Sequence, residues 1–234
     1  MRLADKVAIV TGAGSGFGEG IATRFAAEGA KVVVNDVDSA HGERVAAAIR
    51  QAGGQATFVR ADVSRGDDVK ALLQATLAAY GRLDIQINNA GVSHRNQSML
   101  TVPEDEFDRV YAVNVKSLYW TAQHMAPHFR DNGGGVFINI ASTGGVRPRP
   151  GHAQAGVVAL GRAQNVLDVG RAQNALGSAR IGQLDQHVVS VKGRSVSCGA
   201  NRCGQRVYGH QPCLMATVFT VVNPYSASNP FSRP

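Results

Sequence analysis

Short apolar runs alternate with amphipathic segments along the first 140 residues of the chain. The apolar runs end at glycine or at polar residues, which is typical of strands buried on both faces of a parallel sheet. These predicted strands are residues 6–11, 31–36, 56–60, 85–88 and 135–140. Apolar residues recur at helical spacing in residues 17–28, 39–52, 69–80 and 104–130. The alternation predicts an α/β fold, a doubly wound parallel sheet with helices on both faces.

The pattern becomes irregular after residue 150. Residues 186–191 and 214–222 predict further strands that would complete part of the sheet, and residues 153–176 predict a weak helix. We therefore interpret residues 1–150 as one α/β region. Residues 151–234 are interpreted as an atypical C-terminal segment and not as an independent domain.

The net charge of +7 is unevenly distributed along the chain. Residues 1–150 contain 15 of the 17 acidic residues and 16 of the 24 Lys and Arg residues, a net charge of +1. Residues 151–234 contain only two acidic residues and eight basic ones, a net charge of +6. The basic residues form no stripe and no aromatic platform accompanies them, so the sequence does not favour a nucleic-acid partner.

Composition indicates an ordinary folded protein, with 44% hydrophobic and 18% charged residues. The apolar runs are too short to span a membrane, and Asp5 and Lys6 interrupt the amino-terminal stretch, which does not resemble a secretory signal. We therefore expect a cytoplasmic protein without a membrane partner. Cys198, Cys203 and Cys213 fit reduced thiols, and their spacing matches no structural zinc site, so no metal is expected.

A glycine-rich turn follows the first predicted strand and opens the first predicted helix. The sequence from Thr11 to Gly18 is T-G-A-G-S-G-F-G. Glycine permits a tight turn and close approach of the backbone to a ligand, and the amide groups at the start of a helix bind phosphate. The turn therefore predicts a pyrophosphate site in a Rossmann-like fold, and a turn built only for packing is the alternative.

Asp36 ends the second predicted strand, 18 residues after Gly18. A carboxylate near this place in a dinucleotide-binding fold accepts hydrogen bonds from the adenosine ribose. A 2′-phosphate about 4 Å from the carboxylate would cost on the order of 4 kcal/mol at an effective dielectric constant near 20. Asp36 therefore predicts NAD as the cofactor in preference to NADP, and a solvated loop acid is the alternative.

These residues resemble the short-chain dehydrogenase/reductase family, whose pattern T-G-x-x-x-G-x-G is matched in register. The resemblance extends over residues 3–150, through D-V after the third predicted strand and N-N-A-G at residues 88–91 after the fourth. It identifies residues 1–150 as the NAD-binding region. The cofactor-binding residues that it implies are Gly12, Ser15, Gly16, Phe17, Gly18, Asp36, Asp62, Val63, Asn89, Ala90 and Gly91.

Two further residues match catalytic positions of the family. Asn114, in the V-N-V of the long predicted helix, matches the asparagine, and Ser142, in I-A-S-T, matches the serine. The resemblance implies hydride transfer between a nicotinamide and a small-molecule alcohol or carbonyl substrate, whose oxygen Ser142 would hydrogen-bond. It also implies a homo-oligomer formed through the long helix and its successor, and no regular successor is evident. As alternatives, Asn114 satisfies helix backbone groups and Ser142 caps a strand.

The family's catalytic tyrosine and lysine are missing from the matching positions. Counted from Ser142, the tyrosine falls at Ala155 or Gly156, and no tyrosine of the chain has lysine four residues later. The sequence Y-S-A-S-N at 225–229 has asparagine where the family has lysine. Turnover by this chain is therefore doubtful. The alternative functions are a noncatalytic nucleotide-binding or regulatory protein and, third, a basic-tailed adaptor for nucleic acid.

The family pattern stops at the same place as the charge balance changes. We interpret this as a gene read out of frame, or joined to unrelated sequence, after codon 150. Retranslation of the nucleotide sequence in the other frames tests this hypothesis, and the absence of a Tyr-x-x-x-Lys motif soon after that codon would contradict it.

Overall fold

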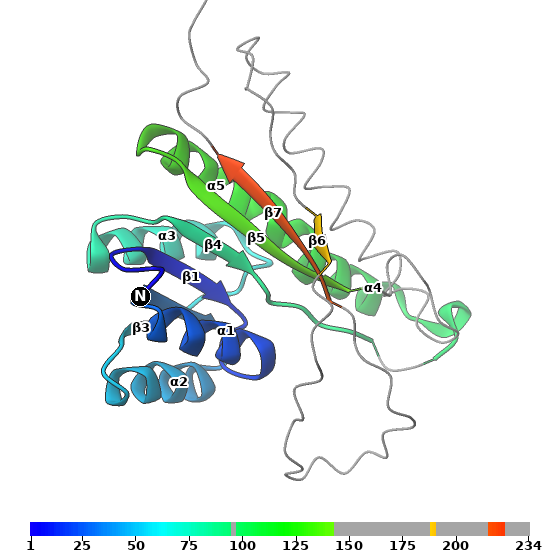
Figure 1. Cartoon of the computed structure of the whole chain (residues 1–234). Helices are drawn as coiled ribbons and strands as arrows, with labels where there is room; N and C mark the ends of the chain where they lie inside the picture. Colours follow the sequence, from blue (N-terminus) through cyan, green and yellow to red (C-terminus); the bar gives the residue numbers. More distant parts are fainter. Residues whose placement is uncertain (95–96, 143–187, 191–214, 223–234) are drawn as a thin grey trace, which may run out of the picture.

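The computed structural model describes residues 1–94, 97–142, 188–190 and 215–222. Its centre is a seven-stranded sheet in the order β3-β2-β1-β4-β5-β7-β6 (Figure 1). The strands are β1 (Val7–Thr11), β2 (Lys31–Asp36), β3 (Gln55–Arg60), β4 (Ile85–Asn88), β5 (Gly135–Ser142), β6 (Val188–Ser190) and β7 (Met215–Val222). The helices are α1 (Gly16–Ala27), α2 (Ser39–Gln51), α3 (Gly66–Tyr80), α4 (Glu104–Tyr111) and α5 (Ser117–Asp131), with a 3-10 turn η1 (Met99–Thr101) and a π-helical turn η2 (Ala112–Lys116).

β1 is the central strand of the parallel part of the sheet. It pairs in parallel with β2 on one side and with β4 on the other, so that Val10 lies opposite both Val34 and Ile87. All five residues of β1 are buried, as the continuous apolar run predicts. The strand order reverses between β1 and β4, and ligands of open α/β sheets bind at the carboxyl ends of strands at such a point.

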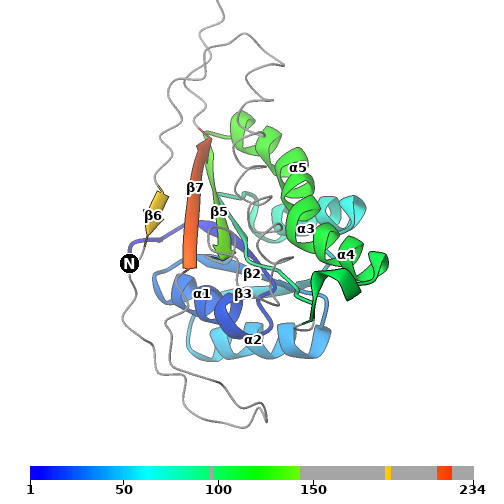
Figure 2. The ribbon, with the colours of Figure 1, turned by 90° about the vertical axis from the view of Figure 1, so that its right-hand side faces the viewer.

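Alternate residues of β1 enter two separate hydrophobic layers. Val10 belongs to a layer that contains Ala22 of α1 and Val45 of α2. Ile9 belongs to the opposite layer, with Leu72 of α3 and Phe129 of α5. Figure 2 shows the same arrangement, with α1 and α2 on one face of the sheet and α3 and α5 on the other. The predicted doubly wound, Rossmann-like architecture is therefore confirmed.

The helix predicted over residues 104–130 has three parts. It begins as α4, widens into the π-helical turn η2 at Ala112–Lys116, and continues as α5 to Asp131. A π-helical turn accommodates an additional residue within a continuous helix, and such turns are frequent at functional sites. Hydrophobic periodicity did not predict the turn because V-N-V fits an ordinary helix equally well.

The two strands predicted after residue 150 are present, but their direction differs from that of the first five. β7 pairs antiparallel with β5, from Gly135 opposite Val222 to Ser142 opposite Met215, and β6 pairs antiparallel with β7. The expectation of a parallel sheet rested on alternating strands and helices, a pattern confined to the first part of the chain. An antiparallel pair requires no crossover helix. The weak helix predicted at 153–176 lies outside the described residues.

Candidate functional site

The glycine turn lies between β1 and α1 and is tightly packed against the segment that follows β4. Gly12 has a φ of +61°, and a Cβ atom there would lie 2.8 Å from the Cα of Ala90. A Cβ atom at Gly18 would collide with the carbonyl oxygen of Gly12. Gly16 also has a positive φ, of +58°, but open space around it. Gly18 therefore serves close packing, Gly16 serves the backbone conformation of the turn, and Gly12 serves both.

The start of α1 presents backbone amide groups without a side-chain cap. Ser15 occupies the N-cap position in an extended conformation, and its side chain makes no capping hydrogen bond. Phe17, in the first turn, is 61% exposed. The first amide groups of a helix have no intrahelical acceptor and carry partial positive charge, so this end of α1 suits an anionic ligand.

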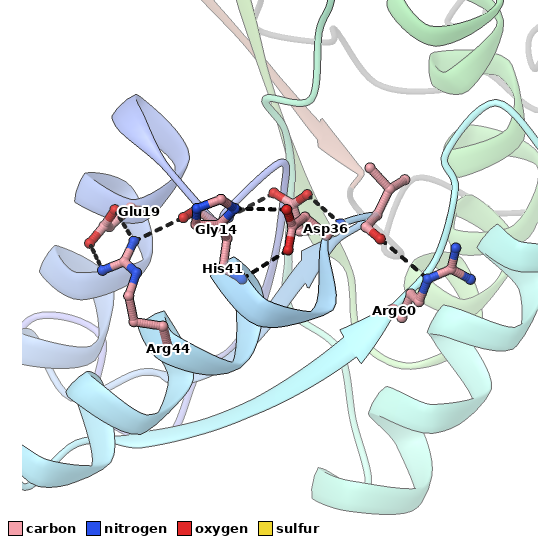
Figure 3. A network of polar contacts seen from close by, with 8 residues as sticks. Gly14, Glu19, Asp36, His41, Arg44 and Arg60 are labelled. Carbon is pink, nitrogen blue, oxygen red and sulfur yellow. Dashed lines mark hydrogen bonds and ion pairs between the residues drawn. The ribbon is translucent and has the colours of Figure 1, made fainter. Parts of the chain in front are cut away.

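Asp36, the last residue of β2, lies directly beside the glycine turn (Figure 3). The amide of Gly14 donates to its Oδ2 at 2.8 Å, and the amide of Asp38 donates to its Oδ1 at 3.0 Å. A Cβ atom at Gly14 would lie 2.8 Å from the same Oδ2 atom. Pairing of β1 with β2 thus brings the predicted ribose acceptor against the predicted pyrophosphate turn. Sequence reasoning did not assign a role to Gly14, because its contact depends on this pairing.

An ion pair between Arg44 and Glu19 holds the carbonyl group of Gly14. Arg44 of α2 donates to the Gly14 carbonyl oxygen at 3.0 Å and to both carboxylate oxygens of Glu19 at 2.9 and 2.8 Å (Figure 3). The hydrogen bond from Arg44 lowers the pKa of Glu19. His41 also approaches the turn, because its Cβ would lie 3.0 Å from a Cβ at Gly14. Sequence analysis found no signal for this pair, whose members lie 25 residues apart.

The turn after β3 is cross-linked around Asp62. The Oδ1 atom of Asp62 accepts hydrogen bonds from the amide and the hydroxyl of Ser64, at 2.9 and 2.7 Å. The amide of Asp62 donates to Oδ2 of Asp68 at 2.9 Å. Val63 is buried. The family resemblance implies that Asp62 and Val63 lie beside the adenine ring, and these hydrogen bonds cross-link the turn at the carboxyl end of β3.

The segment after β4 is bonded to the glycine turn. Asn89 Nδ2 donates to the carbonyl oxygens of Thr11 and Gly12, at 2.9 and 3.1 Å. Thr11 Oγ1 in turn accepts the amides of Asn89 and Ala90, at 3.1 and 3.0 Å. Asn88 Nδ2 donates to Asn139 Oδ1 of β5 at 2.7 Å. These amide hydrogen bonds fix the carboxyl ends of β1, β4 and β5 relative to one another.

Asn114 lies in the middle of η2 and holds the chain that follows β4. Its Oδ1 accepts the amide of Val92 at 2.8 Å, and its Nδ2 donates to the Val92 carbonyl oxygen at 2.7 Å. His94, two residues after Val92, is buried. The side chain of Asn114 is therefore a backbone clamp, and the π-helical turn places it at the same end of the sheet as the glycine turn.

Ser142 is the last residue of β5, opposite Met215 of β7. β5 lies next to β4, so this position belongs to the same end of the sheet as Asn88 and the residues after it. Its role in substrate binding remains a prediction.

Within the described residues, no three His, Cys, Asp or Glu side chains gather as a metal site would require. None of the helices in the described part is long and apolar enough to cross a membrane. The three cysteines and the Y-S-A-S-N sequence lie outside this part of the chain.

The fold and the turn at α1 are those of Rossmann-type nucleotide-binding proteins. The family model of short chain dehydrogenases matches residues 6–154. The chain belongs to this family. Among curated relatives, a 4-formylbenzenesulfonate dehydrogenase of Comamonas testosteroni is 51% identical over 151 residues, which are 64% of this chain and 60% of that protein. A 7alpha-hydroxysteroid dehydrogenase of Escherichia coli (strain K12) is 39% identical over 142 residues, which are 61% of this chain and 55% of that protein. The chain thus spans less than two thirds of the length of these relatives.

Two solved structures illustrate the likeness of the fold. A 3-ketoacyl-(acyl-carrier-protein) reductase from Brucella melitensis complexed with NADH has a TM-score of 0.68 and 44% identity, covering 74% of this chain and 72% of that one. A metagenomic short-chain oxidoreductase in complex with NADP has a TM-score of 0.70 and 32% identity, covering 75% of this chain and 79% of that one. Neighbours of the chain therefore include complexes with both nicotinamide dinucleotides.

Proposed function

We propose that this chain binds NAD at the carboxyl ends of β1, β2 and β4. The observation that carries the proposal is the contact between Asp36 and Gly14, which joins a ribose acceptor to the uncapped start of α1. The residues of this site are Gly12, Ser15, Gly16, Phe17, Gly18, Asp36, Asp62, Val63, Asn89, Ala90 and Gly91. The pyrophosphate lies at the amide groups of α1, the adenosine ribose at Asp36 and the adenine at Asp62 and Val63.

NAD is preferred to NADP because Asp36 repels a 2′-phosphate. Both oxygens of the carboxylate accept backbone amides, which hold the negative charge in place. A phosphate about 4 Å away would cost on the order of 4 kcal/mol at an effective dielectric constant near 20. In the described part of the chain, the ion pairs do not include Asp36, so no bonded cation offsets this repulsion.

The reaction proposed for this site is hydride transfer between the nicotinamide and a small-molecule alcohol or ketone. A bound nicotinamide supplies the hydride chemistry. Ser142 hydrogen-bonds the substrate oxygen from the end of β5. Asn114 clamps Val92 and so fixes the chain between the substrate and the cofactor.

Turnover is doubtful, because the tyrosine and lysine that the family uses to move the proton of the substrate oxygen are missing from the matching positions. Loss of one general acid costs about a hundredfold to ten thousandfold in rate. The same absence favours a second candidate function, a noncatalytic nucleotide-binding or regulatory protein.

Titration of the chain with NADH, followed by NADH fluorescence, tests both candidates. Saturable binding by the folded protein is expected, and its absence would contradict both. A screen of alcohols and ketones then separates them. Turnover that disappears in Ser142→Ala identifies an enzyme with a different proton donor, whereas binding without turnover supports the noncatalytic protein.

A further inference from the structure

Trp120, the single tryptophan of the chain, joins α5 to the turn after β3. Its Nε1–H donates to the carbonyl oxygen of Ser64 at 3.2 Å. Its ring lies against Gly66 at the start of α3, where a Cβ atom would be 2.9 Å from Trp120 Cε3. Indole N–H groups usually have a hydrogen-bond partner when they are buried. Here the partner is a backbone carbonyl 56 residues away in the chain.

The carbonyl that Trp120 holds belongs to the residue that orients Asp62. Ser64 donates its amide and its hydroxyl to Oδ1 of Asp62, at 2.9 and 2.7 Å. Within the described residues, Oδ2 of Asp62 accepts no hydrogen bond, so this oxygen remains available to a ligand. The position of the Asp62 carboxylate thus depends on Ser64, whose carbonyl group is bonded to Trp120.

The indole ring also lies near the π-helical turn that carries Asn114. Lys116, the last residue of η2, places its Nζ 5.5 Å from the centre of the Trp120 ring. Trp120 also stacks on His124, with ring centres 6.4 Å apart. The indole therefore contacts residues of η2 and α5 as well as the turn of Asp62.

We propose that Trp120 is a positioning residue for the adenine end of the dinucleotide. This inference rests on the proposed function, because it assigns Trp120 to the same cofactor site. Trp120 acts through Ser64 and Asp62, so it governs recognition of the adenosine half and leaves recognition of the nicotinamide half unchanged.

Trp120→Phe tests the inference, since it keeps an aromatic ring and removes the N–H donor. We expect NADH and ADP-ribose to bind about three- to tenfold more weakly, the effect of one lost hydrogen bond. Reduced nicotinamide mononucleotide, which lacks the adenosine, is expected to bind as it does to the wild type. NADH fluorescence gives the affinities for the two reduced ligands, and competition with NADH gives that for ADP-ribose.

Tyr119→Phe is the matched control, because Tyr119 is the neighbouring exposed aromatic residue of α5. It should change none of the three affinities. Ser64→Ala removes the hydroxyl bond to Asp62 and should reproduce the selective loss, which keeps the test open if Trp120→Phe does not fold. In folded Trp120→Phe, no loss or an equal loss for all three ligands would overturn the inference, and so would the absence of a loss in Ser64→Ala. Failure of the wild type to bind NADH would instead overturn the proposed function.

Discussion

The two ends of the parallel sheet hold their acidic residues in different ways. At the amino end, Asp84 accepts the amide of Val7 at 2.9 Å and pairs with the guanidinium of Arg82 through both oxygens. Nζ of Lys6 lies 3.7 Å from Oδ1 of the same carboxylate. The carboxylate is largely buried, with 11% of its side chain exposed, and its charge is compensated by cations.

At the carboxyl end, Asp36 is held by backbone amides of Gly14 and Asp38 and, among the described residues, by no cation. The nearby Arg44 is directed instead to Glu19 and to the Gly14 carbonyl oxygen. The first end stabilises the fold, because its charges are neutralised within the chain. The second end retains an uncompensated negative charge, which suits the binding of ribose hydroxyl groups and opposes a phosphate.

Removal of the charge of Asp36 should have the largest effect. In Asp36→Asn, the preference for NADH over NADPH is expected to fall by up to about a thousandfold, because the repulsion of about 4 kcal/mol disappears. Titrations with the two reduced cofactors measure the ratio of dissociation constants. Asp38→Asn is the control, since this exposed acid lies two residues further on. An unchanged ratio in Asp36→Asn would show that Asp36 does not face the ribose.

Substitution at the other end of the sheet should affect stability and not specificity. Asp84→Ala leaves the amide of Val7 and the Arg82 guanidinium without their acceptor, and we expect unfolding to become easier by about 3 kcal/mol. Urea denaturation measures this change, and NADH titration of the folded variant should match the wild type. Asp131→Ala, which removes an exposed pair with Arg130, should be neutral. A large loss of NADH affinity in folded Asp84→Ala would contradict the division between the two ends.

The crowding at Gly14 permits a more local test. In Gly14→Ala the added methyl group would lie 2.8 Å from Asp36 Oδ2, so the carboxylate must move. We expect NADH affinity to fall about tenfold and stability by about 1 to 2 kcal/mol, as for other overpacked sites. Gly20→Ala is the matched control in α1, because a Cβ atom there meets nothing within 4 Å. Alanine should stabilise the helix at that position and leave binding unchanged. Equal NADH affinities in the two variants would place the ribose elsewhere.

The sequence predicted the local parts of this arrangement well. β2 and β4 have the predicted bounds, because valine- or isoleucine-rich runs end there at polar residues. Asp36 was identified as a candidate from its place at the end of β2. The start of α1 was also predicted, to within one residue, from the glycine turn.

The remaining features depend on which elements pack together. The contact of Trp120 with Ser64 requires α5 to cover the turn after β3, and neither residue signals this locally. The π-helical turn at Asn114 does not interrupt the apolar pattern, so periodicity could not reveal it. The antiparallel direction of β7 could not be predicted from the sequence. The rule for parallel strands applies to strands that alternate with helices, and β7 lies beyond that pattern.

The smallest expected effect concerns the ion pair beside the glycine turn. The hydrogen bond from Arg44 lowers the pKa of Glu19 below its ordinary value of 4.5, so the folded state favours the charged carboxylate. This contribution to stability is present above pH 4.5 and is lost as the pH falls through the lowered pKa of the folded state. Because the pair is partly exposed, we expect Glu19→Gln to cost only about 0.5 kcal/mol at neutral pH.

The difference in stability between variant and wild type should vanish in acid, as urea denaturation at a series of pH values would measure. Glu43→Gln, which removes the exposed pair with Arg50, controls for general loss of surface charge. A difference for Glu19→Gln that persists in acid would show that the loss comes from packing and not from the charge.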